Sequence, residues 1–372
     1  MKILQTPARF YPFTGGVENY VHNLSRELVE MGHEVTVLCA NEPESKEEEF
    51  IDGIKVRRVP YIGKIANTNI TPRLPIEIMR EEFDLVHTHL PTPWSADWSA
   101  LASAAKRKPL VLTYYNDIVG EGFAKRLAQL YNRTNLKILL RLASKIIIIQ
   151  PNYLKSSSHL ERFDEKVEAI PVGVDLKRFR PLENDADGNT LFFLSVLDRY
   201  HGYKGLEELL RALVTLRKTV PEVKLIVGGG GELLNHYRRL SHQLHLEENV
   251  EFLGFVPEKM VAKYYNMCDI FLLPSISRAQ EGFGMVLLEA MACGKPVICT
   301  EIAGVAEDVE AEGAGLTIDH ANPDDLVGAI SYLLLNKSEA LKMGEAGRRL
   351  VEKRYGWNEV ARRIEGVYEE LV

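Results

Sequence analysis

Two glutamates eight positions apart are the side chains that point most directly to a chemistry. Glu281 and Glu289 lie in EGFGMVLLEAMACG, residues 281–294, which comes after a short apolar run. Gly282 and Gly284 are placed to open a helix, whose free backbone amides and positive dipole end suit a phosphate group. Glu289 has apolar residues three and four positions away on both sides, so its carboxylate needs hydrogen-bonding partners.

Ribose hydroxyl groups would supply partners to Glu289, and neighbouring backbone groups are the alternative. Glu281 stands in the loop just before the expected helix. A carboxylate in that place could hold the hydroxyls of a sugar, or it could cap the helix or face solvent. The spacing therefore indicates a ligand that carries phosphate and sugar groups.

A second group of residues follows another apolar run, in LDRYHGYKGLEELL at residues 197–210. Arg199 leaves the end of the expected strand, and Lys204 lies at the mouth of the next helix. A cation at a helix N-terminus has the wrong sign for the dipole unless an anion lies between them. Arg199 and Lys204 could therefore clamp one diphosphate, although two solvated surface cations would also fit the pattern.

Paired glycines mark a third place. Gly15 and Gly16 stand between the first apolar run and the first amphipathic stretch, and they permit a close approach of backbone to ligand or simply a tight turn. The run of glycines at 228–231 reads as mainly structural. No G-x-G-x-x-G or P-loop pattern occurs, which disfavours a dinucleotide oxidoreductase and a P-loop nucleotidase.

The elements that must position these residues alternate regularly. Apolar runs of four to seven residues, rich in Val, Ile and Leu, are separated by stretches with helical periodicity, which predicts parallel sheets covered on both faces. Ligands of such sheets bind beyond the carboxyl ends of the strands. The expected strands are residues 2–6, 34–39, 55–59, 85–89, 110–114, 145–149, 191–196, 224–227, 250–254, 270–274, 296–300 and 315–318.

The alternation occurs twice and predicts an α/β chain of two Rossmann-like, doubly wound domains facing a cleft. We expect an N-terminal domain over residues 1–174 and a C-terminal domain over 190–355, joined by a polar segment without periodicity. Residues 357–372 form a separate amphipathic helix.

Composition narrows the class of protein further. The 372 residues have an ordinary globular composition and a net charge of −7, which disfavours nucleic-acid binding driven by bulk phosphate attraction. No apolar run is long enough to span a bilayer, and the first ten residues lack the apolar core of a signal peptide. The four cysteines lack zinc-ligand spacing and read as buried thiols of a cytoplasmic protein.

Taken together, these segments resemble retaining glycosyltransferase family 4, which has the GT-B fold, over nearly the whole chain. The resemblance rests on E-x7-E at Glu281 and Glu289, on R-x4-K-G beginning at Arg199, and on the glycine pair before the first helix. FLGFVPE at 252–258 resembles the segment that lines the nucleotide base. PVGVD at 171–175 resembles the hinge, and the terminal helix is expected to cross back to the N-terminal domain.

The resemblance implies transfer of a mannosyl- or glucosyl-type group from a GDP- or UDP-sugar to a glycan or lipid-linked hydroxyl, with retention and without a metal or other cofactor. Glu281, Arg199 and Lys204 would be catalytic, with Glu281 on the donor sugar and the two cations on the departing diphosphate. The implied donor-binding residues are Gly15, Gly16, Val256, Pro257, Glu258, Gly282, Phe283, Gly284, Met285 and Glu289.

One departure from the family pattern concerns the residues after the strand at 110–114. Many members carry histidine where this chain has Tyr115, and a tyrosine is not a base at neutral pH. This puts in doubt the donor contact or the handling of the acceptor. His87 and His89 are interpreted as pointing to opposite faces of a strand end, so that His89 could reach the cleft or be an ordinary strand-end histidine.

Charge is distributed unevenly along the chain, with a net charge of +2 over residues 1–150 and −9 over the rest. The four cations Arg133, Lys137, Arg141 and Lys145 are spaced by four and would form one basic stripe on a helix, facing solvent or resting on anionic lipid at the inner face of a membrane.

Three alternative functions stay open: a nucleotide-sugar epimerase, a sugar phosphorylase and a non-catalytic sugar-nucleotide-binding protein. The donor base, the acceptor, the linkage and the oligomeric state are not determined by the sequence.

Overall fold

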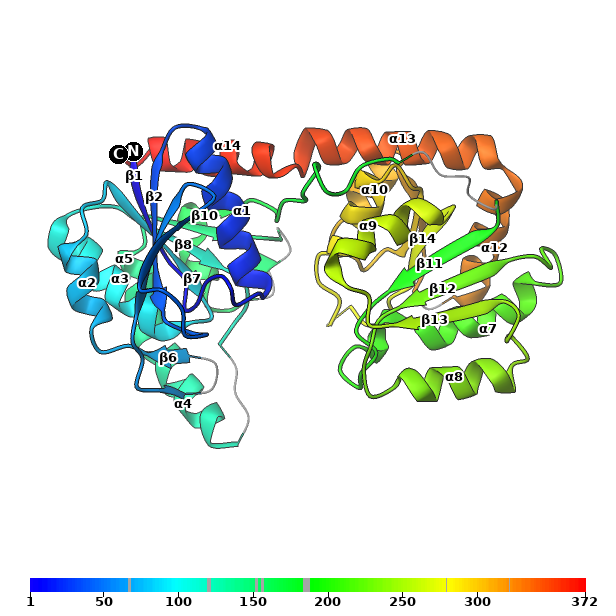
Figure 1. The fold of residues 1–372 in the computed structure, drawn as a ribbon, viewed down its shortest axis with the longest axis horizontal. Helices are drawn as coiled ribbons and strands as arrows, with labels where there is room; N and C mark the ends of the chain where they lie inside the picture. The colour runs from blue at the N-terminus through cyan, green and yellow to red at the C-terminus, as the bar shows by residue number, and fades with distance from the viewer. Residues whose placement is uncertain are drawn as a thin grey trace. The chain divides into compact units, whose positions relative to one another are not determined.

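The computed structural model describes residues 1–65, 68–118, 122–150, 153–154, 157–182, 188–278, 280–320 and 322–372. The chain divides into two compact units, shown in Figure 1. The first unit contains Met1–Gly173 and Trp357–Val372, and the second contains Val174–Gly356. Each unit is built around its own sheet, and both are α/β in architecture.

An eight-stranded sheet forms the centre of the first unit, in the order β10-β9-β8-β7-β1-β2-β4-β3. Its described neighbours pair in parallel except β3 and β4, which are antiparallel. The order reverses between β1 and β7, and this switch point is where such sheets bind ligands. The strands are β1 (Lys2–Thr6), β2 (Glu34–Ala40), β3 (Glu48–Ile51), β4 (Ile54–Val59), β7 (Leu85–Leu90), β8 (Leu110–Tyr114), β9 (Lys145–Ile148) and β10 (Val167–Ala169).

Successive residues of these strands enter different cores, because side chains alternate across a sheet. Ile3 packs in the core that contains α1 and α14, whereas Leu4 packs in the core that contains α2, α3 and α5. A small antiparallel hairpin, β5 (Gly63–Ile65) and β6 (Thr68–Ile70), lies outside the sheet. The helical elements are α1 (Gly16–Glu30), α2 (Leu74–Arg80), α3 (Pro93–Lys106), α4 (Gly122–Arg133), α5 (Asn135–Leu142), the short 3₁₀ helix Glu161–Lys166 and α14 (Trp357–Glu369).

The second unit holds a six-stranded parallel sheet in the order β13-β12-β11-β14-β15-β16. Its switch point falls between β11 and β14. The strands are β11 (Thr190–Leu194), β12 (Lys224–Gly228), β13 (Val250–Gly254), β14 (Ile270–Leu273), β15 (Val297–Thr300) and β16 (Gly315–Ile318).

Helices cover both faces of this sheet. The core containing α9, α10, α11 and α13 lies on one face, and the core containing α7, α8 and α12 lies on the other. The helices are α7 (Leu206–Leu216), α8 (Leu234–Gln243), α9 (Glu258–Met267), α10 (Met285–Ala292), α11 (Ala306–Ala311), α12 (Pro323–Leu335) and α13 (Lys337–Arg354), with a 3₁₀ turn at Gly202–Lys204. The four cysteines of the chain are buried and unbonded.

The C-terminal helix α14 belongs to the first unit, although most of the chain that precedes it belongs to the second. Trp357 at its start packs edge-on against Tyr20 of α1, with ring centroids 5.3 Å apart. A Cβ on Gly173 would come within 2.5 Å of the Trp357 ring, so the chain leaving the first unit passes directly over this indole. Residues of α14 and α1 share one core, and Figure 1 shows the two helices crossing near one end of α1.

Candidate functional site

Lys204 and Glu281 form an ion pair at the carboxyl edge of the second sheet. The Lys204 ammonium lies 2.9 Å from Glu281 Oε1 and 3.0 Å from Oε2. Lys204 follows β11 and Glu281 follows β14, so the pair sits at the switch point of the sheet. This is the position where doubly wound sheets bind their ligands.

A close contact between the two loops fixes this pair. Gly205 has φ +79°, and a Cβ there would fall 1.9 Å from the Pro274 carbonyl oxygen, so only glycine allows the approach. The amide of Ile276 donates to the Tyr203 carbonyl at 2.8 Å. The loops after β11 and β14 are therefore bound to each other next to the pair.

Glu281 is deeply buried, with its side chain 1% exposed, whereas the Lys204 side chain is 17% exposed. Besides Lys204, its carboxylate accepts from the Ser275 hydroxyl and, at 3.0 Å, from the amide of Gly282. Both oxygens thus have protein partners, as a buried carboxylate requires. In this arrangement Glu281 acts as the counter-ion that holds Lys204, and its contact with a sugar would require the pair to separate.

Arg199 does not join Lys204 in this structure. Its side chain is 69% exposed and forms a two-pronged pair with Glu232, Nε to Oε1 at 2.7 Å and Nη2 to Oε2 at 3.3 Å. Glu232 follows the glycine run after β12. A Cβ on Gly229 of that run would fall 1.7 Å from the Ser195 carbonyl oxygen, so this glycine is required by packing.

The N-terminus of α10 lies directly after this ion pair in the chain. Gly284 is the N-cap residue, in the left-handed region at φ +84°, and α10 begins at Met285. Phe283 is buried and packs against Tyr355, with ring centroids 5.7 Å apart, while Gly282 accepts from the Gly304 amide at 3.0 Å. The first amides of the helix point toward the carboxyl edge of the sheet, because the helix follows β14 at that edge.

Glu289, further along α10, has one protein partner among the described residues. Its Oε2 accepts from the Tyr265 hydroxyl at 2.7 Å. Burial raises the pKa of Glu289 to about 7, an effect only partly opposed by the Tyr265 hydrogen bond. Glu289 lies about one turn into α10, whereas Glu281 is in the loop before the helix, and the two carboxylates do not share partners.

The segment expected to line a base connects β13 to α9. Val256 is buried, Pro257 is the N-cap of α9, and Glu258 opens the helix and pairs with Arg178. Phe255 is 80% exposed, so the segment offers an uncovered aromatic ring that the sequence did not single out.

The glycine pair of the first unit has two different surroundings. A Cβ on Gly15 would fall 2.5 Å from Glu18 Oε2, so packing against that carboxylate explains this glycine. A Cβ on Gly16, the first residue of α1, would meet no atom of the described residues within 4 Å, apart from its chain neighbours and the backbone of its own helix. Close approach by a ligand therefore remains a reason for glycine only at position 16.

His87 and His89 lie on the same face of β7, contrary to the expectation that they face apart. Residues two positions apart in a strand share a face, and the two rings are 4.6 Å apart. Both histidines are fully buried, and burial lowers the pKa of His87 to about 3 and that of His89 well below its usual value. His89 is therefore a neutral core histidine and not an exposed cleft residue.

Tyr115 joins this buried group through its hydroxyl, which lies 3.3 Å from His89 Nδ1. His89 Nε2 lies 2.9 Å from Gln5 Oε1, an oxygen that can only accept, so Nε2 carries the proton and Nδ1 accepts from Tyr115. Burial raises the pKa of Tyr115 well above its usual value. Tyr115 is thus a neutral hydrogen-bond donor to His89.

The four cations expected on one helix do not form a single stripe. Arg133 ends α4, Thr134 breaks the helix, and Lys137 and Arg141 lie on α5. Lys145 opens β9 and pairs with Glu370 at 3.2 Å. A spacing of four repeats on one face only while the helix continues, and here it stops.

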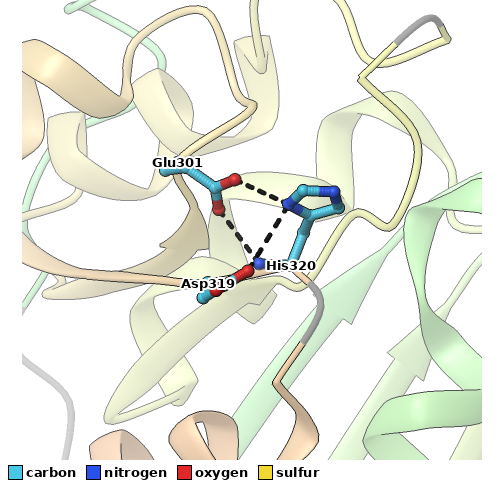
Figure 2. A group of neighbouring side chains, drawn as sticks. All are labelled: Glu301, Asp319 and His320. Atoms are coloured by element: carbon cyan, nitrogen blue, oxygen red, sulfur yellow. Dashed lines mark hydrogen bonds and ion pairs between the residues drawn. The ribbon is translucent and has the colours of Figure 1, made fainter.

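Figure 2 shows Glu301, Asp319 and His320 together after β15 and β16. His320 Nδ1 lies 2.6 Å from Glu301 Oε1 and 3.7 Å from Asp319 Oδ1. Arg278 also lies 3.4 Å from Glu301 Oε1. A cation is already supplied by Arg278, so this is a surface ion-pair cluster and nothing assigns a metal to it.

In the described part of the chain, no helix is both long and apolar enough to cross a bilayer.

Comparison with known proteins gives two adjoining family matches. Residues 14–178 match the model described as Glycosyltransferase Family 4, and residues 177–350 match Glycosyl transferases group 1. A mannosyltransferase of Mycobacterium tuberculosis, named GDP-mannose-dependent alpha-(1-6)-phosphatidylinositol monomannoside mannosyltransferase, is 32% identical over 53% of this chain and 54% of its own length. Its namesake from Mycolicibacterium smegmatis is 27% identical over 94% of this chain and 93% of the relative.

Solved structures share the fold over the whole chain. A glycosyltransferase from Rickettsia africae ESF-5 superposes with a TM-score of 0.75 at 20% identity, covering 100% of this chain and 98% of the other. Anabaena Alr3699/HepE, solved with UDP, gives a TM-score of 0.74 at 20% identity and covers 100% of both chains. The two family models together span residues 14–350, so the chain belongs to the glycosyltransferases, with a family 4 domain followed by a group 1 domain, and the solved neighbours share its GT-B fold.

Proposed function

We propose that this glycosyltransferase transfers a mannosyl- or glucosyl-type group from a nucleoside diphosphate sugar to a hydroxyl of a glycan or a lipid-linked acceptor. The transfer retains the anomeric configuration and uses no metal. The observation that carries the proposal is the Lys204–Glu281 pair beside the N-terminus of α10, at the switch point of the second sheet.

The chemical problem is the departure of the diphosphate. As the bond between the anomeric carbon and the diphosphate oxygen breaks, the diphosphate gains negative charge and the sugar becomes cation-like. Lys204 and the first amides of α10 are groups that stabilise such an anion, and removing one preorganised donor of this kind typically costs about 3–4 kcal/mol in the barrier. Arg199 would add a second cation after leaving Glu232.

Retention requires the acceptor to attack the face from which the diphosphate leaves. The acceptor oxygen then forms its bond to the anomeric carbon, and its proton passes to the departing diphosphate oxygen. This step needs no protein base. Its independence of a base agrees with Tyr115, His87 and His89, because burial moves the pKa of each of these residues away from neutrality.

Nucleoside contacts are assigned to the remaining donor residues. Only one carboxylate oxygen of Glu289 has a hydrogen-bond partner among the described residues, and the other could accept from ribose hydroxyls. The segment at Val256, Pro257 and Glu258, with Phe255 exposed beside it, offers a surface for the base. In the first unit, Gly16 would leave room for a ligand to approach the start of α1.

The names of relatives favour mannose. Two of the full-length matches are named as mannosyltransferases of phosphatidylinositol or its monomannoside, among them Phosphatidyl-myo-inositol mannosyltransferase of M. smegmatis at 28% identity. Alr3699/HepE, by contrast, was solved with UDP and with UDP-glucose. We therefore place GDP-mannose first and UDP-glucose second among the donors.

A donor panel tests the proposal. Purified protein is incubated with GDP-mannose, GDP-glucose, UDP-glucose and UDP-N-acetylglucosamine, and diphosphate release is measured with and without phosphatidylinositol vesicles and methyl α-D-mannopyranoside. We expect release from one donor, stimulated by an acceptor, and early proton NMR spectra showing a retained α configuration. Diphosphate binding without release from any donor would support a non-catalytic binding protein, and interconversion of free donor sugars would support an epimerase.

A peripheral membrane contact is the finer proposal for the acceptor side. Helices α4 and α5 expose Leu127, Leu130, Ile138 and Leu142, beside cations that have no ion pair among the described residues: Lys125, Arg126, Arg133, Lys137 and Arg141. Residues 122–145 contain no acidic side chain. Exposed aliphatic groups among unpaired cations are typical of helices that lie on anionic lipid.

Vesicle sedimentation tests that contact. We expect binding to phosphatidylcholine vesicles with 30% phosphatidylserine or phosphatidylinositol, and at least fivefold weaker binding by Leu130→Ser/Lys137→Gln. Tyr332→Ser/Lys342→Gln, which alters exposed residues of the second unit, is the matched control. Equal binding to neutral vesicles, or equal loss in the control, would remove the contact from the proposal.

A further inference from the structure

Phe283 and Gly284 form the turn that leads into α10. The Gly282 amide before them donates to the Glu281 carboxylate at 3.0 Å, and the Leu287 amide donates to the Gly284 carbonyl at 2.8 Å. Among the described residues, the amides of Phe283 and Gly284 themselves donate to no protein group. Free amides in this position can receive an anion. The direction in which they point depends on what holds the turn in place.

Tyr355, at the end of α13, packs against this turn through an aromatic contact. Its ring centroid lies 5.7 Å from that of Phe283, and the two rings are tilted by 58°. Both residues are buried in one core, with Tyr355 4% exposed and Phe283 7% exposed. Because side chains in a close-packed core cannot shift independently, the Tyr355 ring fixes the orientation of Phe283 and of the peptide groups beside it.

Tyr355 is itself anchored through both its side chain and its main chain. Its hydroxyl donates to Asp308 Oδ2 on α11, and Arg354 pairs with Asp308 Oδ1 at 2.5 Å. The Tyr355 carbonyl accepts from the Val174 amide at 2.7 Å. All of these partners belong to the second unit. The ring therefore offers Phe283 a surface whose position is set by three other segments of that unit.

Gly304 contacts the same turn from the chain that leads into α11. Its amide donates to the Gly282 carbonyl at 3.0 Å. A Cβ on Gly304 would lie 3.0 Å from Phe283 Cα and 3.1 Å from the Gly282 carbonyl oxygen, so a side chain there would push on the turn. The backbone of Gly304 lies outside the left-handed region, and contact with the turn is therefore the reason for glycine at this position.

From these contacts we propose that Tyr355 and Gly304 are positioning residues for the donor, and that they hold the turn before α10 so that its two free amides meet the diphosphate. The inference rests on the proposed function, because it takes the donor diphosphate as the ligand of this turn. Both residues act through Phe283. Helix α11 connects them, since Gly304 precedes it and Asp308 lies within it, and the contacts form a closed set around the turn.

This role predicts a loss of affinity confined to the phosphate part of the donor. The nucleoside is proposed to contact Glu289 and the segment 256–258, whose partners Tyr265 and Arg178 are not part of this set of contacts. A residue that merely supported the fold would instead weaken the binding of nucleoside and diphosphate together. The ratio of the two affinities therefore separates positioning from general stability.

Calorimetry measures that ratio with GDP against guanosine and with UDP against uridine, on the full chain and on variants whose folding is checked by circular dichroism. Tyr355→Leu removes the ring, Tyr355→Phe removes only the hydroxyl, and Gly304→Ala pushes on the turn from the α11 side. Steady-state assays add the donor KM.

Each type of substitution has a matched control in the second unit. Tyr237→Leu alters a buried tyrosine in the core on the other face of the sheet. Gly328→Ala adds a methyl group that would meet no described atom within 4 Å, apart from its chain neighbours and the backbone of its own helix. Neither residue contacts the turn before α10 in the described part of the chain, so both controls should keep the wild-type ratio within twofold.

We expect Tyr355→Leu and Gly304→Ala each to lower the preference for the diphosphate over its nucleoside at least fivefold, and to raise the donor KM by the same factor. Nucleoside affinity should stay within twofold. Tyr355→Phe should lose less than Tyr355→Leu, because its ring still contacts Phe283.

An unchanged preference in either folded variant would overturn the inference, and if one of the two did not fold, the other would decide. An equal loss in the controls, or an equal loss of nucleoside and diphosphate affinity, would overturn it as well. A wild-type protein that bound neither diphosphate more tightly than its nucleoside would contradict the proposed function itself, and this outcome is recognised before any variant is made.

Discussion

Lys204 and Glu281 are 77 positions apart in the sequence, yet the ammonium of one lies within 3.0 Å of both carboxylate oxygens of the other. Glu281 is almost fully enclosed, so the pair must be formed for its charge to be tolerated. This relationship links the loops after two adjacent strands of the second sheet and sets the position of the cation proposed to meet the diphosphate.

Removing one partner of this pair should destabilise the protein strongly. Lys204→Met leaves a buried charge without its counter-ion, and we expect the free energy of unfolding to fall by about 3–5 kcal/mol, measured by urea denaturation at pH 7.5. Adding Glu281→Gln removes the stranded charge, so the double variant should recover at least half of the loss. Strictly additive effects would show that the two side chains do not depend on each other.

Glu289 should make stability depend on pH in a known direction. Its folded pKa is raised from 4.5 to about 7 by burial, so its contribution is fully present below pH 4.5 and is lost as pH rises through 7. A pKa difference of one between the folded and unfolded states corresponds to about 1.4 kcal/mol, so wild type should lose about 2–3 kcal/mol relative to Glu289→Gln between pH 4.5 and 8. Parallel pH profiles of the two proteins would contradict the raised pKa.

Tyr368 should anchor α14 through a buried hydrogen bond. Its hydroxyl lies 2.6 Å from His87 Nδ1, and both residues are fully buried. Tyr368→Phe leaves that nitrogen without its short hydrogen bond, so we expect a loss of about 1–3 kcal/mol in thermal or urea unfolding. The exposed Tyr332→Phe is the control and should change stability by less than about 0.5 kcal/mol. A loss in the control as large as that in Tyr368→Phe would argue against an anchoring role.

Arg199 should matter for turnover and hardly at all for stability. Its pair with Glu232 is exposed on both sides, and such pairs contribute little to folding. Arg199→Ala should therefore unfold like wild type while turnover with the best donor falls at least tenfold. Glu232→Gln frees the guanidinium and should leave turnover at or above the wild-type rate. Normal turnover in Arg199→Ala would remove this residue from the leaving-group assignment.

Much of the fold follows from local sequence patterns. All twelve apolar runs proposed as strands are strands, within about two residues, because fully buried parallel strands are continuous in Val, Ile and Leu. Strands β3, β5, β6 and β10 were not predicted. They are short, lie at a sheet edge or outside the sheets, and contain charged or polar residues such as Glu48, Lys64 and Glu168, so they lack that pattern.

Side-chain partners were harder to predict than strands. The sequence placed Lys204 and Glu281 at the ends of strands but not in contact, since strand order is not readable from spacing. The partners Ser275, Tyr265 and Glu232 were missed. Glu232 directly follows the glycine run, and Ser275 directly follows the Pro274 that leaves β14, so position at a strand end was the available signal.

The predictions for the basic stripe and for the two histidines were wrong for simple geometric reasons. Four-residue spacing was extended across Thr134, where the helix stops, and residues two apart in a strand were assigned to opposite faces. Arg9 was not singled out at all, because its contacts with Glu18 and Glu42 depend on which loops the parallel strands bring together.

The central claim is that a diphosphate is bound by Lys204 and the first amides of α10, and calorimetry with matched ligands tests it most directly. GDP and UDP are compared with guanosine and uridine on wild type and on the charge-compensated Lys204→Met/Glu281→Gln variant, after its folding is checked by circular dichroism. We predict that wild type binds one diphosphate at least a hundredfold more tightly than its nucleoside, and that the variant loses at least tenfold of this preference. An undiminished preference in the folded variant would contradict the claim.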